Sequence, residues 1–323
     1  MTTHVTLRPS GHSFVVEGRD SILQAGLKAG LALPYGFSNG SCGSCLARLV
    51  SGSIEPCGHH DFIVPEAQKA EGYFLMCAHE AVSTTLEFET WEASGAVEMP
   101  EQRISLRIKT VEYPVPEIAV VRARAPRSQR LRFLAGQSVT LSVPGGGSKS
   151  VSLASCPCDD MNLEFHLPRR PDCPLADAFF RDIPPPTVDL VGPTGDFVLG
   201  EPAGRVLLFV AEGSGFAPVR SLIEHAQSLD DERPMVLYWF ATGEGHYMAN
   251  LCRSWAEAFD DFQYVPVGLD DRQRALDRIA ETVPVRVSTD VYAAAGEPLL
   301  EAVSRVLRDN GVEPGRIRLS LIT

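Results

Sequence analysis

Short strand patterns and one helix pattern fill the first 90 residues. Apolar and polar side chains alternate over residues 4–8 and 13–17, which predicts a strand hairpin. Apolar residues at helical spacing follow in residues 22–27. Residues 46–50 and 84–89 again alternate with a period of two. This order of elements predicts a small mixed α+β domain at residues 1–92.

The helix pattern has recognisable ends. Asp20 or Ser21 can cap its N-terminus, and Gly30 stands where a C-cap is expected. Gly26, inside the apolar stripe, is a poor helix former and weakens the prediction.

The pattern of apolar and polar residues changes twice further along the chain. Residues 92–102 are small, polar and acidic, and we place a linker at residues 93–102. Residues 103–200 contain short strand patterns broken by glycine and proline, which predicts a compact antiparallel barrel. In residues 201–323, buried strand patterns alternate with helix patterns, which predicts a doubly wound parallel sheet. The apolar runs of this last part are residues 206–211, 235–241, 262–267, 291–295 and 317–322.

Composition narrows the function classes. The chain has 323 residues, of which 44% are hydrophobic and 22% charged, as in ordinary globular proteins. A formal net charge of −12 argues against a protein that neutralises nucleic-acid phosphates. No leader-like segment or apolar run of about 18 residues is found, so we expect a cytoplasmic protein without a membrane span. The eight cysteines are too sparse and uneven for a disulfide scaffold, and their closest groups suggest metal ligation.

The cysteine-bearing loop resembles a known cluster site. Residues 33–45 (LPYGFSNGSCGSC) and 75–79 (LMCAH) resemble the loop of plant-type [2Fe-2S] ferredoxins. This family spaces its ligands as Cys-x4-Cys-x2-Cys with a distant fourth. The resemblance implies ligation by Cys42, Cys45 and Cys77, whereas Phe37 stands at the first ligand position. A complete cluster then needs a ligand from Cys57, from a serine hydroxyl (Ser38 or Ser41) or from a partner protein; otherwise the domain is an empty ferredoxin-like fold.

The second part of the chain resembles the flavin barrel of the ferredoxin–NADP reductase family. The similarity lies in residues 133–141, in residues 149–155 (KSVSLAS) and in residues 163–169 (LEFHLPR). It implies that FAD contacts Lys149, Ser150, Ser152 and His166, with Ser152 facing the reactive edge as the catalytic candidate. The alternative interpretation of Ser152 is an ordinary serine of a strand, with no role in flavin binding.

Two features of this module depart from the family. Lys149 replaces an arginine that forms a bidentate contact, and Val151 replaces an aromatic platform. The turn at residues 171–175 carries two prolines and Asp172 where relatives place a glycine-rich, phosphate-binding turn.

The third part resembles the nicotinamide module of the same family. Residues 206–218 combine a strand, a glycine turn and a helix start, a grouping that lets backbone N–H groups approach a pyrophosphate. The resemblance implies dinucleotide contacts from the residues Gly213, Ser214, Gly215, Pro218 and Gly296. Ala294 or Ala295 replaces the family's cysteine near the nicotinamide. Residues 242–246 lack an arginine and contain Glu244, which favours NADH over NADPH.

The order of the three resemblances covers nearly the whole chain. It resembles the iron-sulfur flavoprotein reductase components of oxygenases and of deoxysugar dehydratase systems. The resemblance implies a β-grasp ferredoxin-like domain, an antiparallel flavin-binding β-barrel and a doubly wound parallel α/β nicotinamide domain. It further implies that electrons pass from NADH through FAD and a [2Fe-2S] centre to a partner oxygenase or dehydratase. The departures leave two alternatives, a reductase that keeps flavin but has lost the cluster, and a pseudoenzyme that lacks some or all cofactors and acts as a scaffold or regulatory subunit.

Overall fold

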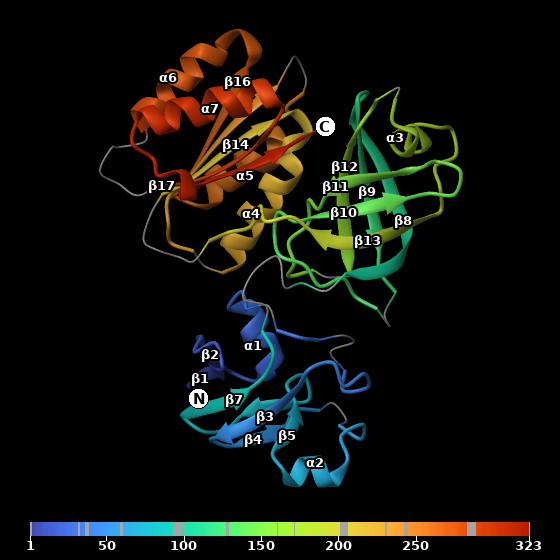
Figure 1. The fold of residues 1–323 in the computed structure, drawn as a ribbon, viewed down its shortest axis with the longest axis vertical. Coiled ribbons are helices and arrows are strands. Elements are labelled where there is room, and N and C mark those ends of the chain that lie inside the picture. The colour runs from blue at the N-terminus through green and yellow to red at the C-terminus, as the bar shows by residue number, and fades with distance from the viewer. Residues whose placement is uncertain are drawn as a thin grey trace.

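The computed structural model has three modules, and Figure 1 shows the N-terminal module (blue) at one end of the molecule. The barrel (green) and the C-terminal module (orange to red) lie side by side at the other end. The described residues are 2–31, 33–35, 39–58, 61–92, 99, 101–126, 129–159, 161–170, 172–200, 206–229, 231–241, 245–282 and 289–322. Among the helices of these residues, none is long and apolar enough to span a bilayer.

The N-terminal module is a β-grasp fold. Its main sheet has the order β2-β1-β7-β3-β5, in which β1 and β7 are parallel, and β4 and β6 form a separate pair. The elements are β1 (Thr2–Arg8), β2 (Ser13–Glu17), α1 (Ile22–Lys28), β3 (Leu46–Ser51), β4 (Ile54–Pro56), α2 (Glu66–Ala70), β5 (Tyr73–Leu75), β6 (His79–Ala81) and β7 (Thr85–Glu89). The predicted hairpin at residues 4–8 and 13–17 is confirmed.

Helix α1 begins with a complete capping box. The Ser21 side chain accepts from the Gln24 backbone N–H, and the Gln24 side chain accepts from the Ser21 N–H. Ser21, rather than Asp20, is therefore the N-cap. A Cβ at Gly26 would lie 2.4 Å from Leu33 Cδ1, so the glycine that weakened the helix prediction lets Leu33 pack closely against the helix.

The middle module is a curled six-stranded antiparallel sheet of order β11-β10-β13-β8-β9-β12. Its two edge strands, β11 and β12, come into contact, which nearly closes the barrel. The elements are β8 (Gln102–Val115), β9 (Ile118–Arg124), β10 (Ser138–Ser142), β11 (Ser148–Ser152), β12 (Asn162–Pro168), α3 (Pro174–Phe179) and β13 (Thr187–Thr194). Because β8 begins at Gln102, the last residue of the predicted linker belongs to the barrel.

The C-terminal module is a five-stranded, all-parallel sheet of order β16-β15-β14-β17-β18. The chain starts in the centre, moves to one edge and then crosses β14 to the other side, as in doubly wound folds. Its elements are β14 (Val206–Glu212), the 3-10 turn η2 (Gly213–Gly215), α4 (Phe216–Ser228), β15 (Met235–Ala241), α5 (Ala249–Ala258), β16 (Phe262–Gly268), η3 (Leu269–Asp271), α6 (Arg272–Thr282), β17 (Thr289–Ala295), α7 (Glu297–Asp309), η4 (Pro314–Arg316) and β18 (Ile317–Leu321). The five predicted strand runs are confirmed.

Two separate cores hold this sheet. Apolar side chains of α4 and α5 pack on one face, around Trp239, while those of α6 and α7 pack on the other. Helix α4 also fastens this module to the barrel. The Ser221 hydroxyl donates to the Ser155 carbonyl at 2.7 Å and accepts from the Gly136 N–H at 3.3 Å. The barrel and the α/β module therefore share a polar junction.

Candidate functional site

Two of the three predicted cluster ligands lie together. Cys45 at the start of β3 and Cys77 after β5 are both buried, and their Sγ atoms are 3.2 Å apart. Two thiolates on one tetrahedral metal, each about 2.3 Å from it, lie slightly less than 4 Å apart. Cys45 and Cys77 are therefore placed to share one iron.

The environment of this pair favours a thiolate at Cys77, whereas the same hydrogen bond and burial raise the pKa of Cys45. The hydrogen bond from the Cys45 thiol lowers the pKa of Cys77 to about 7, against the opposing effect of burial. The Gly40 N–H also points at Cys77 and lowers its pKa further. Backbone N–H groups directed at sulfur are the arrangement that iron-sulfur clusters use.

The rest of the ligand set is less complete. Cys42 is half-buried in the same loop, but within the described residues no three Cys, His, Asp or Glu side chains converge on a metal position. Phe37 and Ser38 lie outside the described residues. Cys57 Sγ lies 3.9 Å from the Cys77 carbonyl oxygen, so a fourth thiol is close to the pair. The residues present fit one iron through two thiolates, and the second iron has Cys42 as its nearest candidate.

The predicted flavin residues line one cleft between the barrel and the α/β module. This cleft of about 120 Å³ contains Lys149, Ser150, Ser152 and His166 on the barrel side. Ser214 of η2 and Ala217 of α4 line it from the α/β module. The C-terminal residues 320–322 complete the wall, and Figure 1 shows the end of the chain beside the barrel. The structure therefore brings candidates from two modules to one site.

The chemistry of the barrel wall partly fits a flavin dinucleotide. Ser152 Oγ lies 3.2 Å from Ser138 Oγ, so its hydroxyl is oriented at the cleft wall. Lys149 supplies a cation for phosphate, while Val151 is nearly buried against the barrel core and offers no aromatic face. At the turn before α3, Pro174 occupies the first helical position and the Cys173 N–H donates to the Arg170 carbonyl. The hydroxyl groups and the lysine fit the group, whereas at this turn Pro174 has no N–H and the Cys173 N–H is already used within the chain.

The two ring nitrogens of His166 belong to a buried hydrogen-bond network and do not point into the cleft as free ligand contacts. Its Nε2 lies 2.9 Å from Glu164 Oε1, and its Nδ1 lies 2.8 Å from the Tyr247 hydroxyl. Burial lowers the pKa of His166, so the neutral ring donates from Nε2 to the carboxylate and accepts from Tyr247. Both nitrogens are thus engaged by protein groups, and the predicted contact to FAD is left to the carbon edge of the ring.

Glu164 is the centre of this network and was missed in the sequence. It accepts from Arg122 Nε at 2.8 Å and is also bound by Arg220 of α4. Burial would raise its pKa, but His166 and the two guanidinium groups outweigh burial and lower the pKa to about 2. The network ties β12 to α4 and to residue 247, directly behind the cleft. Its charged residues are 42 to 56 positions apart, so no local pattern marks them.

The nicotinamide candidates meet at the switch point of the parallel sheet. Gly213, Ser214 and Gly215 follow β14, and Gly296 follows β17, its hydrogen-bonded neighbour. Ligands of doubly wound sheets bind at the carboxyl ends of strands where the order reverses, which here is between β14 and β17. Pro218 lies in the first turn of α4. The structure therefore brings these predicted residues to one edge.

Close packing and hydrogen bonds hold the glycine turn after β14 against the end of β17. A Cβ at Gly215 would lie 2.0 Å from the Ala294 carbonyl oxygen, so only glycine lets the turn approach β17. Trp239 Nε1 donates to the Gly213 carbonyl at 3.1 Å, and Glu212 Oε2 accepts from the Gly296 N–H at 2.9 Å. Trp239 is thus both a core aromatic and a support of the turn. Residues 242–244, including Glu244, lie outside the described residues.

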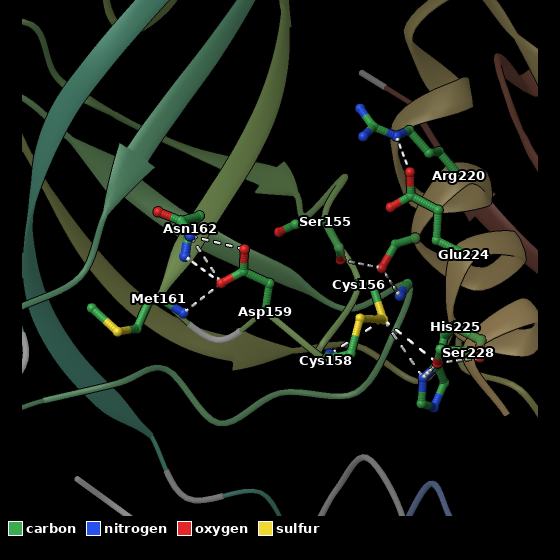
Figure 2. Close-up of a disulfide and its surroundings, with 12 residues drawn as sticks. Ser155, Cys156, Cys158, Asp159, Met161, Asn162, Arg220, Glu224, His225 and Ser228 are labelled. Atoms are coloured by element: carbon green, nitrogen blue, oxygen red, sulfur yellow. Dashed lines mark hydrogen bonds and ion pairs between the residues drawn. A yellow bond between two sulfur atoms is a disulfide. The ribbon is translucent and has the colours of Figure 1, made fainter. Parts of the chain in front are cut away.

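One covalent feature was not expected from the sequence. Cys156 and Cys158 form a disulfide in the loop after β11 (Figure 2). The spacing Cys-Pro-Cys is the available signal, but the eight cysteines are too sparse and uneven along the chain to suggest a disulfide scaffold.

Comparison with protein-family models identifies two of the modules. Residues 5–82 match the 2Fe-2S iron-sulfur cluster binding domain, and residues 209–299 match the oxidoreductase NAD-binding domain. The first match spans the β-grasp module, and the second spans most of the parallel sheet.

Curated relatives match over nearly the full chain. The chain is 26% identical over 320 residues to the CDP-6-deoxy-L-threo-D-glycero-4-hexulose-3-dehydrase reductase of Yersinia pseudotuberculosis, covering 97% of this chain and 96% of the relative. It is 25% identical over 323 residues to reductase component 2 of a terephthalate 1,2-dioxygenase from Comamonas, covering 97% and 95%.

Two solved structures are similar to this one in fold. The Amycolatopsis cytochrome P450 reductase GcoB superposes with a TM-score of 0.63 at 25% identity, covering 99% of this chain and 98% of that one. Phthalate dioxygenase reductase has a TM-score of 0.56 at 18% identity, covering 71% and 70% of the two chains, and supports the fold alone.

These relatives are named as reductases or reductase components, and they do not support the pseudoenzyme alternative. The order of modules, the thiol pair at the cluster loop and the cleft shared by two modules all agree with the matches. The chain thus combines a 2Fe-2S iron-sulfur cluster binding domain with an oxidoreductase NAD-binding domain, and it is similar over nearly its full length to reductases and reductase components of other enzyme systems.

Proposed function

We propose that the chain is the NADH-dependent reductase component of a two-component system. It would pass electrons through FAD and a [2Fe-2S] centre to a separate oxygenase or dehydratase. The names of the Yersinia and Comamonas relatives support this class of partner. We further propose a cytoplasmic location, since NADH and such partners are found there.

The cleft between the barrel and the α/β module carries this proposal. Hydride transfer requires the donor and acceptor rings to lie in contact, because the reacting atoms must approach to about 3–3.5 Å. Ser152 at the end of β11 and Ser214 in the turn before α4 line the same cleft. A ring bound by the barrel and a ring bound at the switch point would therefore face the same space.

The residues of the cleft have separable roles. When bound, FAD accepts a hydride from NADH and passes on single electrons, which is the chemistry that links a two-electron donor to a one-electron acceptor. Lys149 would neutralise phosphate charge, although as a point charge without the bidentate geometry of arginine. The Ser152 hydroxyl, oriented by Ser138, would donate to the reactive edge. The Glu164 network holds the two walls together.

The glycine turn after β14 would receive the dinucleotide. Backbone N–H groups at a helix start attract pyrophosphate, and the close packing of Gly215 on β17 keeps this surface open. Glu244 would repel the additional phosphate of NADPH, so we propose NADH as the reductant.

One experiment tests the proposal directly. The protein is purified anaerobically, supplied with FAD, and its visible spectrum is recorded before and after addition of NADH or NADPH. Flavin bands that bleach with NADH, and much more slowly with NADPH, are expected. A protein that takes up no FAD, or whose flavin stays oxidised with both nucleotides, would contradict the proposal. Iron and acid-labile sulfide assays on the same sample distinguish a complete reductase from one that has lost its cluster.

A further inference from the structure

Cys156 and Cys158 close a very small disulfide ring. They flank Pro157 in the loop between β11 and β12, with their Cα atoms 5.2 Å apart. The stabilisation that a disulfide gives through chain entropy grows with the length of the loop that it closes. A ring of three residues therefore gives little of it. A bond with little structural benefit, in a protein proposed to be cytoplasmic, is more typical of redox chemistry.

The two sulfur atoms have different environments. Cys156 is buried, whereas Cys158 is exposed. Cys156 Sγ accepts from the Cys158 backbone N–H at 3.2 Å and lies 3.9 Å from His225 Nδ1 and 3.8 Å from Ser228 Oγ. Figure 2 shows His225 and Ser228 reaching the Cys156 side of the disulfide from helix α4. Thiol–disulfide exchange needs access to the attacked sulfur, so Cys158 is the sulfur that an external thiolate can reach.

The groups around Cys156 favour its sulfur as the one that leaves when the disulfide is attacked and that later attacks to form the disulfide again. The Cys158 N–H stabilises a negative charge on this sulfur. Burial lowers the pKa of His225 to about 4, so its imidazole is neutral near pH 7. The neutral imidazole nitrogen can accept a hydrogen bond from the Cys156 thiol once the disulfide is reduced.

Cys158 opens into a cavity where all three modules meet. The cavity has a volume of about 410 Å³, which is large enough for a small organic ligand. It is lined by Leu23 and Leu31 of the ferredoxin-type module, by Arg130, Arg132 and Cys158 of the barrel, and by His225 of α4.

The polar lining of this cavity favours an anion. Lys28 at its rim is paired with Asp20 at 2.7 Å, and these two charges compensate each other. Arg132 adds a positive charge to the lining on the barrel side. A ligand with carboxylate groups is the complement of this lining.

We propose that Cys156 and Cys158 are a redox-active pair that exchanges with a low-molecular-weight, carboxylate-bearing thiol in this cavity, with Cys158 as the attacked and Cys156 as the resolving sulfur. This inference rests on the proposed cytoplasmic location, but its chemistry does not involve the flavin cleft.

The exchange balances in two steps. A thiolate of the small molecule attacks Cys158 Sγ, a new S–S bond forms there, and the Cys156–Cys158 bond breaks with its electron pair left on Cys156, which is then protonated. A second small thiolate attacks the small molecule's sulfur in this mixed disulfide and releases Cys158 as a thiolate. Two small thiols are oxidised to their disulfide, and the protein disulfide is reduced to two thiols. Reoxidation by the small disulfide follows the same steps in reverse.

The mixed-disulfide stage has a structural consequence. An adduct on Cys158 would lie between helix α1 of the ferredoxin-type module and the barrel, because both line the cavity. The ratio of small thiol to small disulfide around the protein would thereby affect the contact between the ferredoxin-type module and the other two modules.

Peptide mapping of the full-length protein tests the pair. The protein is alkylated under native conditions before and after treatment with dithiothreitol, and again after reoxidation with glutathione disulfide. A disulfide between residues 156 and 158 should be present, should be reduced without denaturant and should form again. Residues 156 and 158 that remain unpaired thiols throughout, or a disulfide that dithiothreitol reduces only in denaturant, would overturn the proposal.

Two single variants test the assignment of the sulfurs. Cys156→Ser should trap a glutathione adduct on Cys158, because the resolving thiol is missing. Cys158→Ser should give at least roughly tenfold slower adduct formation on the buried Cys156. Cys173→Ser is the matched control for a buried cysteine of the same module and should behave as the parent. Equal labelling of the two positions in variants with parent-like circular dichroism would overturn the assignment.

The choice of probe tests the ligand class. Cystamine, a small disulfide with ammonium groups in place of carboxylates, is compared with glutathione disulfide on the reduced Cys156→Ser variant. Reaction at Cys158 should be roughly tenfold faster with glutathione disulfide, and salt should reduce the difference. Equal rates, or faster reaction with cystamine, would overturn the carboxylate preference.

Discussion

The hydroxyl of Ser152 tests whether the barrel wall still serves a flavin. Ser152→Ala removes a group held 3.2 Å from Ser138 Oγ at the edge of the cleft. If it donates to the reactive edge of the ring, the rate of flavin reduction by NADH should fall about 10²-fold, the usual effect of losing one preorganised donor.

The control for this change lies on the adjacent strand. Ser142→Ala alters a serine of β10 that does not line the cleft, and it should leave the rate unchanged. Stopped-flow absorbance measures both variants at equal FAD content. An unaltered rate in Ser152→Ala would identify Ser152 as an ordinary strand serine.

Glu164 is the second single residue for which the structure predicts a large effect, here on the free energy of unfolding. Its pKa of about 2 lies below the 4.5 of a free glutamate, so the folded state favours the carboxylate. The resulting stability is present above pH 4.5 and is lost as the pH falls from about 4.5 towards 2. It amounts to about 3 kcal/mol. Glu164→Gln should therefore lower the unfolding free energy at pH 7 by about this amount and flatten its acid dependence over that range.

Urea unfolding followed by the fluorescence of Trp239 and Trp255, both in the α/β module, measures this effect. Glu112→Gln is the matched control, because Glu112 is an exposed partner of the same Arg122. It should change the unfolding free energy by less than about 1 kcal/mol. Equal effects of the two changes would show that the buried network adds no stability.

At the scale of elements, the nicotinamide site depends on how closely the turn after β14 approaches β17. Gly215→Ala places a Cβ 2.0 Å from a backbone oxygen that cannot rotate away, so the turn and the strand must separate. A displacement of about 1 Å at a reacting centre costs on the order of 10²-fold in rate. We expect kcat/KM for NADH to fall by about this factor.

The control for Gly215 is Gly268→Ala at the end of β16. A Cβ there meets no atom within 4 Å, so NADH oxidation should remain at the parental level. Steady-state reduction of an artificial acceptor measures both variants. Unchanged kcat/KM in Gly215→Ala would mean that dinucleotide binding does not use this edge.

At the scale of the whole molecule, electron delivery depends on whether the ferredoxin-type module holds a complete cluster. Phe37 replaces the first ligand, while Cys45 and Cys77 are already in place to share an iron. Phe37→Cys should therefore raise the iron and sulfide content after reconstitution towards one complete cluster per chain.

Two further variants interpret the iron measurement. Ile183→Cys adds an exposed cysteine far from the loop in sequence and should not change the iron content. Cys57→Ser should lower the iron content of the parent protein if Cys57 supplies the missing ligand, and should leave it unchanged in Phe37→Cys. If Phe37→Cys binds no more iron than the parent, wider changes in the loop prevent assembly.

The sequence by itself determined the three modules, because strand alternation, turn residues and glycine-rich turns are local properties that persist in the fold. It also suggested Ser152, Lys149 and the glycine turn as candidate site residues through short motifs. Only the tertiary structure decided which residues face one another. In the folded chain both ring nitrogens of His166 contact protein groups, and Leu33 packs closely against Gly26. Cys156 is also bonded to Cys158 beside His225. Such contacts join residues distant in the chain, so burial and geometry, rather than local pattern, determine their chemistry.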